Sequence, residues 1–233
     1  MSDVLQELLA GQAVWRCRES ADGLTAGAGT TPTVTTGYSV LDSYLPGGGW
    51  PLDSLMEVIV SESGIGELRL LMPALTELAA NRDGHIVWVA PPYMPYAPAL
   101  AQWGLDVARV LLIHSSQVDD VLWATGEALA SGSALAVLSW MPEMDVAETR
   151  RLQLAASSAK SWAIAFRSDS SARHQSSAAT LRLALQAGSK GTEIDFFKIR
   201  GARPRRISGY DEYRGHWPQL DGRPFAHQSS VPG

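Results

Sequence analysis

The sequence is poor in cysteine, in net charge and in long apolar runs. Its one cysteine, Cys17, excludes an internal disulfide framework and a cysteine metal cluster. The net charge is only −5 over 233 residues, so no global field draws the chain towards nucleic acid or an anionic membrane. No apolar run reaches the roughly 18 residues of a membrane-spanning helix. The histidines are scattered, without metal-ligand spacing.

The N-terminus also lacks a basic segment followed by a long apolar stretch, so we expect no secretory signal and a cytoplasmic location. What the chain does have is 45% apolar and 18% charged residues. That balance is enough for a sizeable buried core. The length favours one α/β domain with extensions over two small domains.

Composition divides the chain into three segments. Residues 1–35 combine a short amphipathic helix with a linker rich in Gly, Thr, Ala and Ser. The apolar stripe of that helix is formed by Val4, Leu5, Leu8 and Leu9. It is predicted to pack either on a neighbouring copy, giving a homo-oligomer, or on its own domain. Residues 36–209 are the predicted core domain, and residues 210–233 read as a flexible polar tail.

Five short apolar runs containing β-branched residues predict buried strands of a parallel sheet. They lie at 55–60, 85–90, 109–113, 134–139 and 162–166. Amphipathic helical patterns separate them, which predicts βαβ crossovers and a mostly parallel central sheet. Two capping boxes, Ser116 with Asp119 and Asp145 with Glu148, predict where two of the helices begin.

The pattern changes after the fifth run. Residues 180–187 alternate strictly between apolar and polar positions and residues 193–200 alternate as well, which predicts an antiparallel hairpin at the C-terminal edge of the sheet. The alternation shifts phase between Phe196 and Phe197, as a β-bulge would require. The segment 167–180 before the hairpin is polar and is predicted to be a flexible surface loop.

The first apolar run leads into SESGIGELRLL, the strand, glycine-rich loop and helix of a phosphate-binding loop. A working loop requires G-x-x-x-x-G-K-[ST], and the aligned residues are Ser61, Gly66, Glu67 and Leu68. Glu67 replaces the cation that pairs with phosphate, and Leu68 replaces the hydroxyl that binds Mg²⁺. Two like charges about 4 Å apart repel by roughly 1–4 kcal/mol. We therefore expect no cofactor, no metal and no ATP hydrolysis; alternatively, ESGIGE is a simple turn with Glu67 at the positive helix end.

Two further catalytic positions of such an enzyme are also changed. The run at 134–139, which should end in a magnesium-binding aspartate, ends in Ser139 and is followed by Trp140. An activating glutamate would be expected after the run at 85–90, where Ala90, Pro91 and Pro92 stand instead. With these changes added to those in the loop, the sequence predicts a protein that is not an enzyme.

A basic cluster lies near the end of the predicted hairpin. It consists of Lys198, Arg200, Arg203, Arg205 and Arg206. The cluster is predicted to contact DNA or a protein partner, or else to be a solvated hairpin edge protected by charge. Neighbouring acidic residues reduce the positive electrostatic potential of the cluster.

Several motifs resemble the RecA/RadA recombinase core across residues 36–166. They are TGYSVLD followed by LPGGGWP, and WGLD followed by RVLLI. With ESGIGELRLL and VWVAPP, the set resembles the ImuA family, RecA-like accessory proteins of an SOS-induced mutasome that are sometimes labelled SulA-like. The family's ATP-binding residues do not carry over, because Glu67, Leu68 and Ser139 have the wrong chemistry.

The resemblance implies a RecA-like α/β core and a cytoplasmic role in the DNA-damage response. The implied partner is ImuB, a polymerase-like protein, with RecA and an error-prone replicative-type polymerase as further candidates. In RecA relatives the segment matching 167–180 is a DNA-binding loop; here it holds only Arg167, Arg173 and His174, so direct DNA binding is expected to be weak or absent. A SulA-like cell-division inhibitor that binds the tubulin-like division protein, and a residual nucleotide-binding switch, remain alternatives.

Overall fold

The computed structural model describes residues 31–208, apart from 116, 142, 168–169 and 189–190. The chain divides into two units, Met1–Thr30 and Thr31–Gly233, and all described residues belong to the second. The predicted N-terminal helix and the predicted tail therefore lie outside the described residues. The first described strand, β1 (Thr33–Val34), lies before residue 36, where the core domain was predicted to begin. The three proposed segments of the chain stay predictions.

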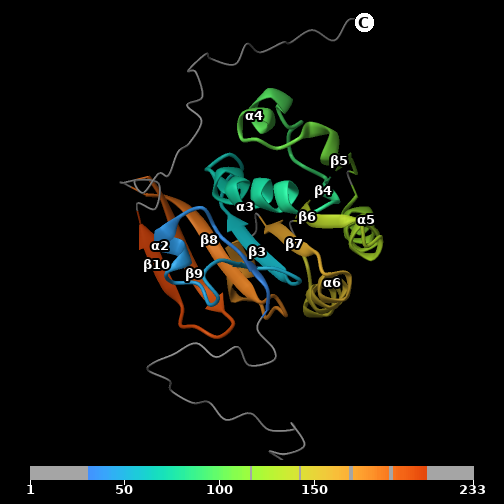
Figure 1. Ribbon diagram of the computed structural model, residues 1–233. Helices are drawn as coiled ribbons and strands as arrows, with labels where there is room; N and C mark the ends of the chain where they lie inside the picture. Colours follow the sequence, from blue (N-terminus) through green and yellow to red (C-terminus); the bar gives the residue numbers. More distant parts are fainter. Residues whose placement is uncertain (1–30, 116, 142, 168–169, 189–190, 209–233) are drawn as a thin grey trace, which may run out of the picture. The chain divides into compact units, whose positions relative to one another are not determined.

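Eight strands form one mixed sheet in the order β10-β9-β8-β3-β7-β6-β4-β5 (Figure 1). All strands from β8 to β5 in this order run parallel, whereas β9 and β10 are antiparallel to their neighbours. The predicted α/β class, with a mostly parallel sheet and an antiparallel C-terminal edge, is therefore confirmed. The strands are β3 (Leu55–Val60), β4 (His85–Val89), β5 (Val110–Ile113), β6 (Ala134–Trp140), β7 (Trp162–Arg167), β8 (Leu181–Gly188), β9 (Gly191–Ile199) and β10 (Arg205–Ser208).

Helices cover both faces of this sheet because successive side chains of a strand point to opposite faces. On β3, Met56 and Val58 join the core cluster that includes α3, whereas Leu55 joins the one that includes α5 and α6. The longer helices are α3 (Glu67–Asn81), α5 (Val118–Ala130) and α6 (Val146–Ala159). The short ones are α2 (Ser39–Asp42), α4 (Ala97–Gln102), η1 (Val107–Arg109) and η2 (Ser170–His174). No helix in the described part of the chain is long and apolar enough to cross a bilayer.

Only one of the two predicted capping boxes forms. The Asp145 carboxylate accepts from the Glu148 N–H, and the Glu148 carboxylate accepts from the Asp145 N–H, both at 2.7 Å. The predicted box at α5 is wrong: the N-cap residue is Gln117, whose side chain makes no capping bond. Ser116 lies outside the described residues. The helix simply begins one residue later than the Ser-x-x-Asp spacing requires.

The hairpin formed by β8 and β9 is present, but it is not the sheet edge. β8 pairs in parallel with β3, and β10 adds outside β9. The sequence did not predict β10, because Arg205 and Arg206 mask the short strand with charge. The bulge is confirmed: Arg182 lies opposite Lys198 and Leu183 opposite Phe196, so Phe197 is the additional residue.

The segment before β3 fixes α3 to the sheet. β1 pairs with β2 (Trp50–Pro51), and the Asp42 carboxylate accepts from the Thr36 N–H at 2.8 Å. Gly37 has φ 80°, and a Cβ at this position would lie 2.5 Å from the Cβ of Pro73 in α3. The TGYSVLD motif is therefore explained by packing, since only glycine lets the backbone approach the helix this closely.

Candidate functional site

The glycine-rich loop after β3 is filled by one of its own side chains. Gly66, with φ 110°, is the N-cap of α3, and Glu67 is the first helical residue. The Glu67 side chain turns back into the loop and is only 4% exposed. Its Oε1 accepts from the Gly64 N–H at 2.8 Å, and its Oε2 accepts from the Gly66 N–H at 3.1 Å.

These two N–H groups belong to the part of the loop that would cradle a phosphate in a nucleotide-binding protein. A helix N-terminus favours an anion, and here the Glu67 carboxylate is that anion. A phosphate would have to displace this carboxylate as well as overcome its charge. Ser61 is exposed, and Leu68, in the first turn of α3, is partly buried and packs against the core. The loop is also tied to β9, where the Thr192 hydroxyl donates to the Ile65 carbonyl at 3.2 Å.

A buried ion cluster lies on the α5–α6 face of the sheet. Glu57 of β3 is fully buried, and its Oε2 accepts from Arg182 Nε of β8 at 2.8 Å. Arg167 of β7 brings Nη1 to 3.8 Å from the same oxygen. The Ser177 hydroxyl donates to the other Glu57 oxygen. Three neighbouring strands thus meet through one carboxylate.

The same cluster anchors the segment that was predicted to be a flexible loop. Arg182 donates to the carbonyls of Ala172 at 2.6 Å and Gln175 at 2.8 Å. Lys198 Nζ donates to the Ser177 carbonyl at 2.6 Å. Residues 175–180, between η2 and β8, do form a loop, and two of its carbonyls are held by these bonds; its flexibility stays a prediction. The sequence signal for this cluster was a charged residue inside each of two apolar strands, Glu57 in LMEVIV and Arg182 in TLRLALQA. Their pairing could not be predicted, because it depends on the order of the strands in the sheet.

The residues of the basic cluster differ in their burial and in their contacts. Lys198 is half-buried; burial, reinforced by the Arg182 charge, lowers its pKa below the ordinary lysine value. Arg206 pairs with Asp195 at 3.2 Å, and the Arg205 guanidinium lies 4.0 Å from the centre of the Tyr44 ring. Arg200 and Arg203 are exposed. Because Arg205 and Arg206 are consecutive in β10, they point to opposite faces. Arg205 and Arg206 therefore do not share one face of the sheet.

Asp195 is the carboxylate on which two of these cations converge. Arg173 of η2 and Arg206 of β10 both pair with it. Burial raises the pKa of Asp195, but hydrogen bonds from Arg173 and Arg206 outweigh that effect and lower it below the ordinary aspartate value. Arg173, one of the few basic residues expected to face DNA, is thus committed to an internal pair.

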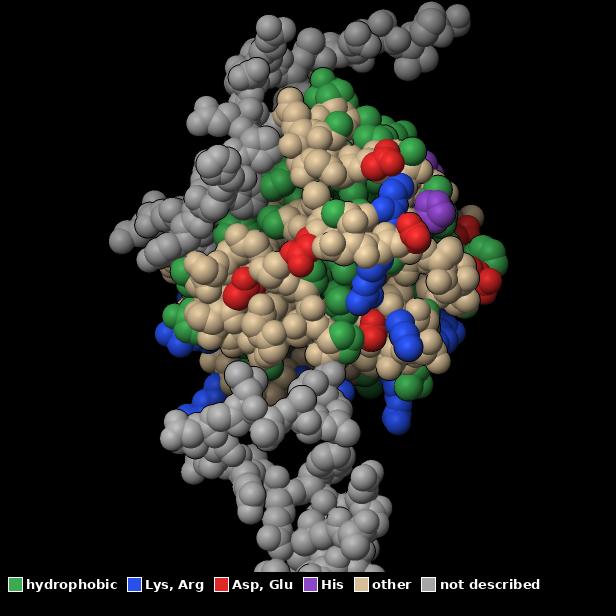
Figure 2. All heavy atoms as spheres, in the orientation of Figure 1, with side chains coloured by type: hydrophobic (Ala, Val, Ile, Leu, Met, Phe, Trp, Pro, Cys, Tyr) green, Lys and Arg blue, Asp and Glu red, His purple; other side chains and the backbone are tan. Residues whose placement is uncertain are grey.

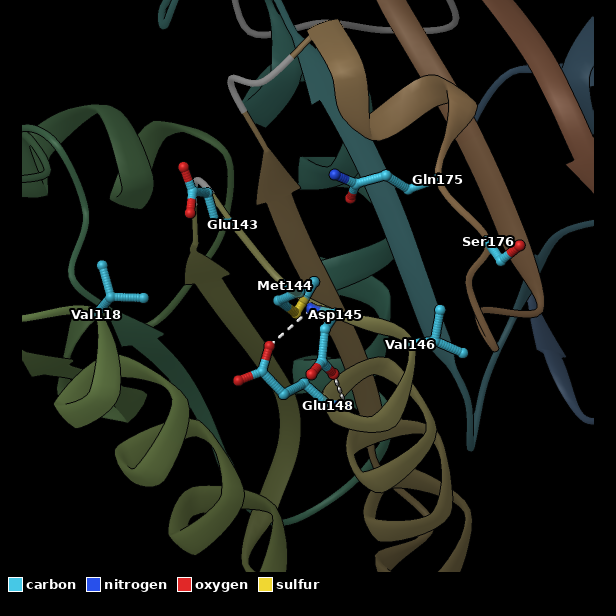
Figure 3. Close-up of a pocket in the computed structure, with 8 residues that line it drawn as sticks. All are labelled: Val118, Glu143, Met144, Asp145, Val146, Glu148, Gln175 and Ser176. Atoms are coloured by element: carbon cyan, nitrogen blue, oxygen red, sulfur yellow. Dashed lines mark hydrogen bonds between the residues drawn. The ribbon is translucent and has the colours of Figure 1, made fainter.

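An open hollow of about 700 Å³ lies beyond the carboxyl ends of β5, β6 and β7. In α/β sheets, ligands bind in the crevice at this end of the strands. Figure 3 shows the residues that line the hollow, among them Glu143, Asp145 and Glu148. No described lysine or arginine lines it. These acids would repel a phosphate backbone, so the hollow does not suit DNA.

Comparison with known proteins confirms the resemblance to the ImuA family and to SulA. Protein ImuA of Caulobacter vibrioides is 29% identical over 129 residues, which are 54% of this chain and 53% of ImuA. Cell division inhibitor SulA of Edwardsiella piscicida is 30% identical over 106 residues, or 44% of this chain and 63% of SulA. This chain therefore spans about half the length of the ImuA relative that it matches.

The family described as cell division inhibitor SulA matches residues 53–163. Among solved structures, the crystal structure of SulA from Pseudomonas aeruginosa is 27% identical, with a TM-score of 0.41. That match covers 48% of this chain and 96% of the SulA chain. The family match begins just before β3 and ends within β7, so it includes the loop that Glu67 fills.

Proposed function

We propose that this chain, as a relative of ImuA, is a non-catalytic RecA-like accessory protein that supports error-prone translesion synthesis in the DNA-damage response. Its principal partner would be a polymerase-like protein of the ImuB type. The observation that carries the proposal is the Glu67 carboxylate, which satisfies the Gly64 and Gly66 N–H groups of the loop. A protein with this loop is better suited to binding partners than to hydrolysing nucleotide.

A RecA-like frame is supported by the place of the glycine-rich loop. The loop follows β3, which lies inside the sheet between β8 and β7. The strand–loop–helix unit is therefore kept while the residues that would hold phosphate and Mg²⁺ are replaced. We propose the cytoplasm as its location, and RecA and an error-prone replicative-type polymerase as further partners.

The test is binding between the purified full-length chain and the ImuB-type protein of the same organism. We expect a stable complex without nucleotide, and an affinity that does not change when Mg-ATP is added. A ligand that binds neither state of a protein cannot shift its equilibria. Failure to form the complex, or a complex that requires Mg-ATP, would contradict the proposal.

A SulA-like division inhibitor is the second candidate, favoured by the family match over residues 53–163. Under this alternative the purified chain slows polymerisation of the tubulin-like division protein, and overproduction makes cells filamentous. Under the translesion proposal neither effect occurs. A residual nucleotide switch, the third candidate, requires nucleotide to raise thermal stability.

Two surface assignments remain proposals. Direct DNA contact through the basic cluster of Lys198, Arg200, Arg203, Arg205 and Arg206 is expected to be weak, and reversing the charges of Arg203, Arg205 and Arg206 tests it together with partner binding. Self-association through Val4, Leu5, Leu8 and Leu9 is tested by deleting residues 1–20. An unchanged mass in solution would remove that idea.

A further inference from the structure

A groove of about 570 Å³ runs between α5 and α6. Its lining residues recur at three- and four-residue spacing along each helix, so each helix contributes one face. Buried Leu122 and Leu152 form part of the lining, and the two helices pack against each other. The lining residues are Asp119, Leu122, Trp123, Gly126 and Glu127 of α5, and Glu148, Arg151, Leu152 and Ala155 of α6.

The most exposed apolar group of the groove is the indole of Trp123, which is 67% exposed. Large exposed hydrophobic side chains also occur at Val118, Val146 and Leu154 of the same two helices. Single exposed apolar residues are ordinary on a protein surface, and Leu154 lines neither cavity. Trp123, however, lines the groove, and Val118 and Val146 line the adjoining hollow. Tryptophan is also the residue type most enriched where binding energy is concentrated.

Gly126 gives the groove a second distinctive feature. A glycine inside a helix costs about 1 kcal/mol of stability relative to alanine. A Cβ at Gly126 would meet no atom within 4 Å. No contact among the described residues therefore requires glycine here. Its missing side chain leaves space beside Trp123 in which another chain can approach the backbone of α5 closely.

The charges of the groove select a partner of opposite sign. Asp119, Glu127 and Glu148 line it, with Arg151 as the one base among its described lining residues. Through Glu148 the groove meets the hollow of Figure 3, where Glu143 and Asp145 add acidic groups. At the right-hand rim of Figure 2, over α5, hydrophobic and acidic side chains lie side by side.

A groove between two helices, with apolar groups inside and acids along its rim, matches the shape and charge of a third helix. We propose that the α5–α6 groove binds a cationic amphipathic helix of a partner protein, which seats an apolar side chain against Trp123 above Gly126. The proposal does not depend on which cellular process the partner serves.

Binding of a labelled Leu/Lys amphipathic peptide of about five helical turns to the full-length chain tests the proposal, with fluorescence anisotropy as the measurement. A Leu/Glu peptide of identical spacing is the charge control. We expect the Leu/Lys peptide to bind at least tenfold more tightly than the Leu/Glu peptide. Trp123→Ala should weaken binding at least tenfold, whereas Tyr93→Ala, at a 75% exposed aromatic elsewhere, should leave it unchanged. Equal binding of the two peptides, or equal effects of the two substitutions, would overturn the proposal.

Gly126→Ala separates docking from a role in folding. The substitution should raise the thermal midpoint of unfolding, because alanine is the better helix former. It should at the same time weaken binding of the Leu/Lys peptide several-fold. A higher midpoint with unchanged peptide affinity would contradict the proposal.

Other occupants give different results. If Trp123→Ala halves the mass of the chain in solution, the groove binds a second copy. If changing Leu8 and Leu9 to serine in the full chain raises the affinity for the Leu/Lys peptide tenfold, the chain's own N-terminal segment fills the groove. Either result would overturn assignment to a partner protein.

Discussion

Two buried glutamates on the same strand–loop–helix unit have different roles. Glu57 is enclosed by the cations of two neighbouring strands, whereas Glu67 bonds to backbone N–H groups of its own loop. Both are charged groups inside otherwise apolar surroundings, where an unpaired charge is very costly. Each should therefore be intolerant of substitution, for a different reason.

Glu57→Gln should reduce the free energy of unfolding by about 3–5 kcal/mol, because it leaves Arg167 and Arg182 buried without their counter-charge. Urea denaturation followed by circular dichroism measures the loss. Arg206→Gln is the matched control: it removes a cation that is more than half exposed, while Asp195 keeps its pair with Arg173, so it should cost at most about 1 kcal/mol. Similar losses in the two variants would mean that the Glu57 cluster contributes no more than a surface pair.

Glu67→Ala should lower the free energy of unfolding by about 1–3 kcal/mol, since the Gly64 and Gly66 N–H groups lose a charged acceptor. Glu62→Ala changes an exposed glutamate of the same loop and should stay within about 0.5 kcal/mol of the unsubstituted protein. Equal stability of both variants would show that the carboxylate does not hold the loop.

Asp195 should make stability fall in acid. Its pKa is lowered in the folded protein, so its contribution is present above the ordinary aspartate pKa of about 3.9 and is lost as the pH falls through the folded value. Asp195→Asn should therefore reduce the difference between unfolding free energies measured near pH 7 and below about pH 4. An unchanged difference would contradict the role of the Arg173 and Arg206 pairs.

At the scale of elements, local patterns predicted strands and helices better than their ends or neighbours. The apolar runs predicted β3, β4, β6 and β7 because buried parallel strands are continuously apolar, and the phase shift at Phe197 predicted the bulge. The run at 109–113 also forms a strand, β5, but β5 lies at the edge of the sheet with Leu111 and Leu112 exposed, so its prediction as a buried strand is wrong. Helix α5 began at a different residue, and β10 was missed because its charges hide a four-residue strand. The Glu57 cluster also required knowledge of strand order, since Glu57 and Arg182 are 125 residues apart.

The capping box of α6 gives a prediction at this scale. Asp145→Ala should lower the free energy of unfolding by about 1 kcal/mol through loss of the bond from the Glu148 N–H. Gln117→Ala at the N-cap of α5 should have almost no effect, because the Gln117 side chain caps nothing. Thermal unfolding of both variants measures the contrast. A larger loss at Gln117 would mean that the assigned helix start is wrong.

At the scale of the whole molecule, the sheet places the filled loop, the anchored η2 segment and the acidic hollow together at the carboxyl ends of the parallel strands. The sequence showed that Glu67 places an anion where a phosphate-binding loop needs a cation. It did not show that the Glu67 carboxylate turns back into the loop, because that depends on the conformation of Gly64 and Gly66. The family resemblance was visible in the motifs. The α5–α6 groove was not, because it forms only when two separate helices pack.

Calorimetric titration of Mg-ATP into the full-length chain tests the central claim most directly. We expect no heat of binding at millimolar nucleotide and no rise in thermal midpoint, because the Glu67 carboxylate already occupies the Gly64 and Gly66 N–H groups. Micromolar binding of Mg-ATP that is abolished by altering this loop would show that the nucleotide displaces Glu67, and would contradict the claim.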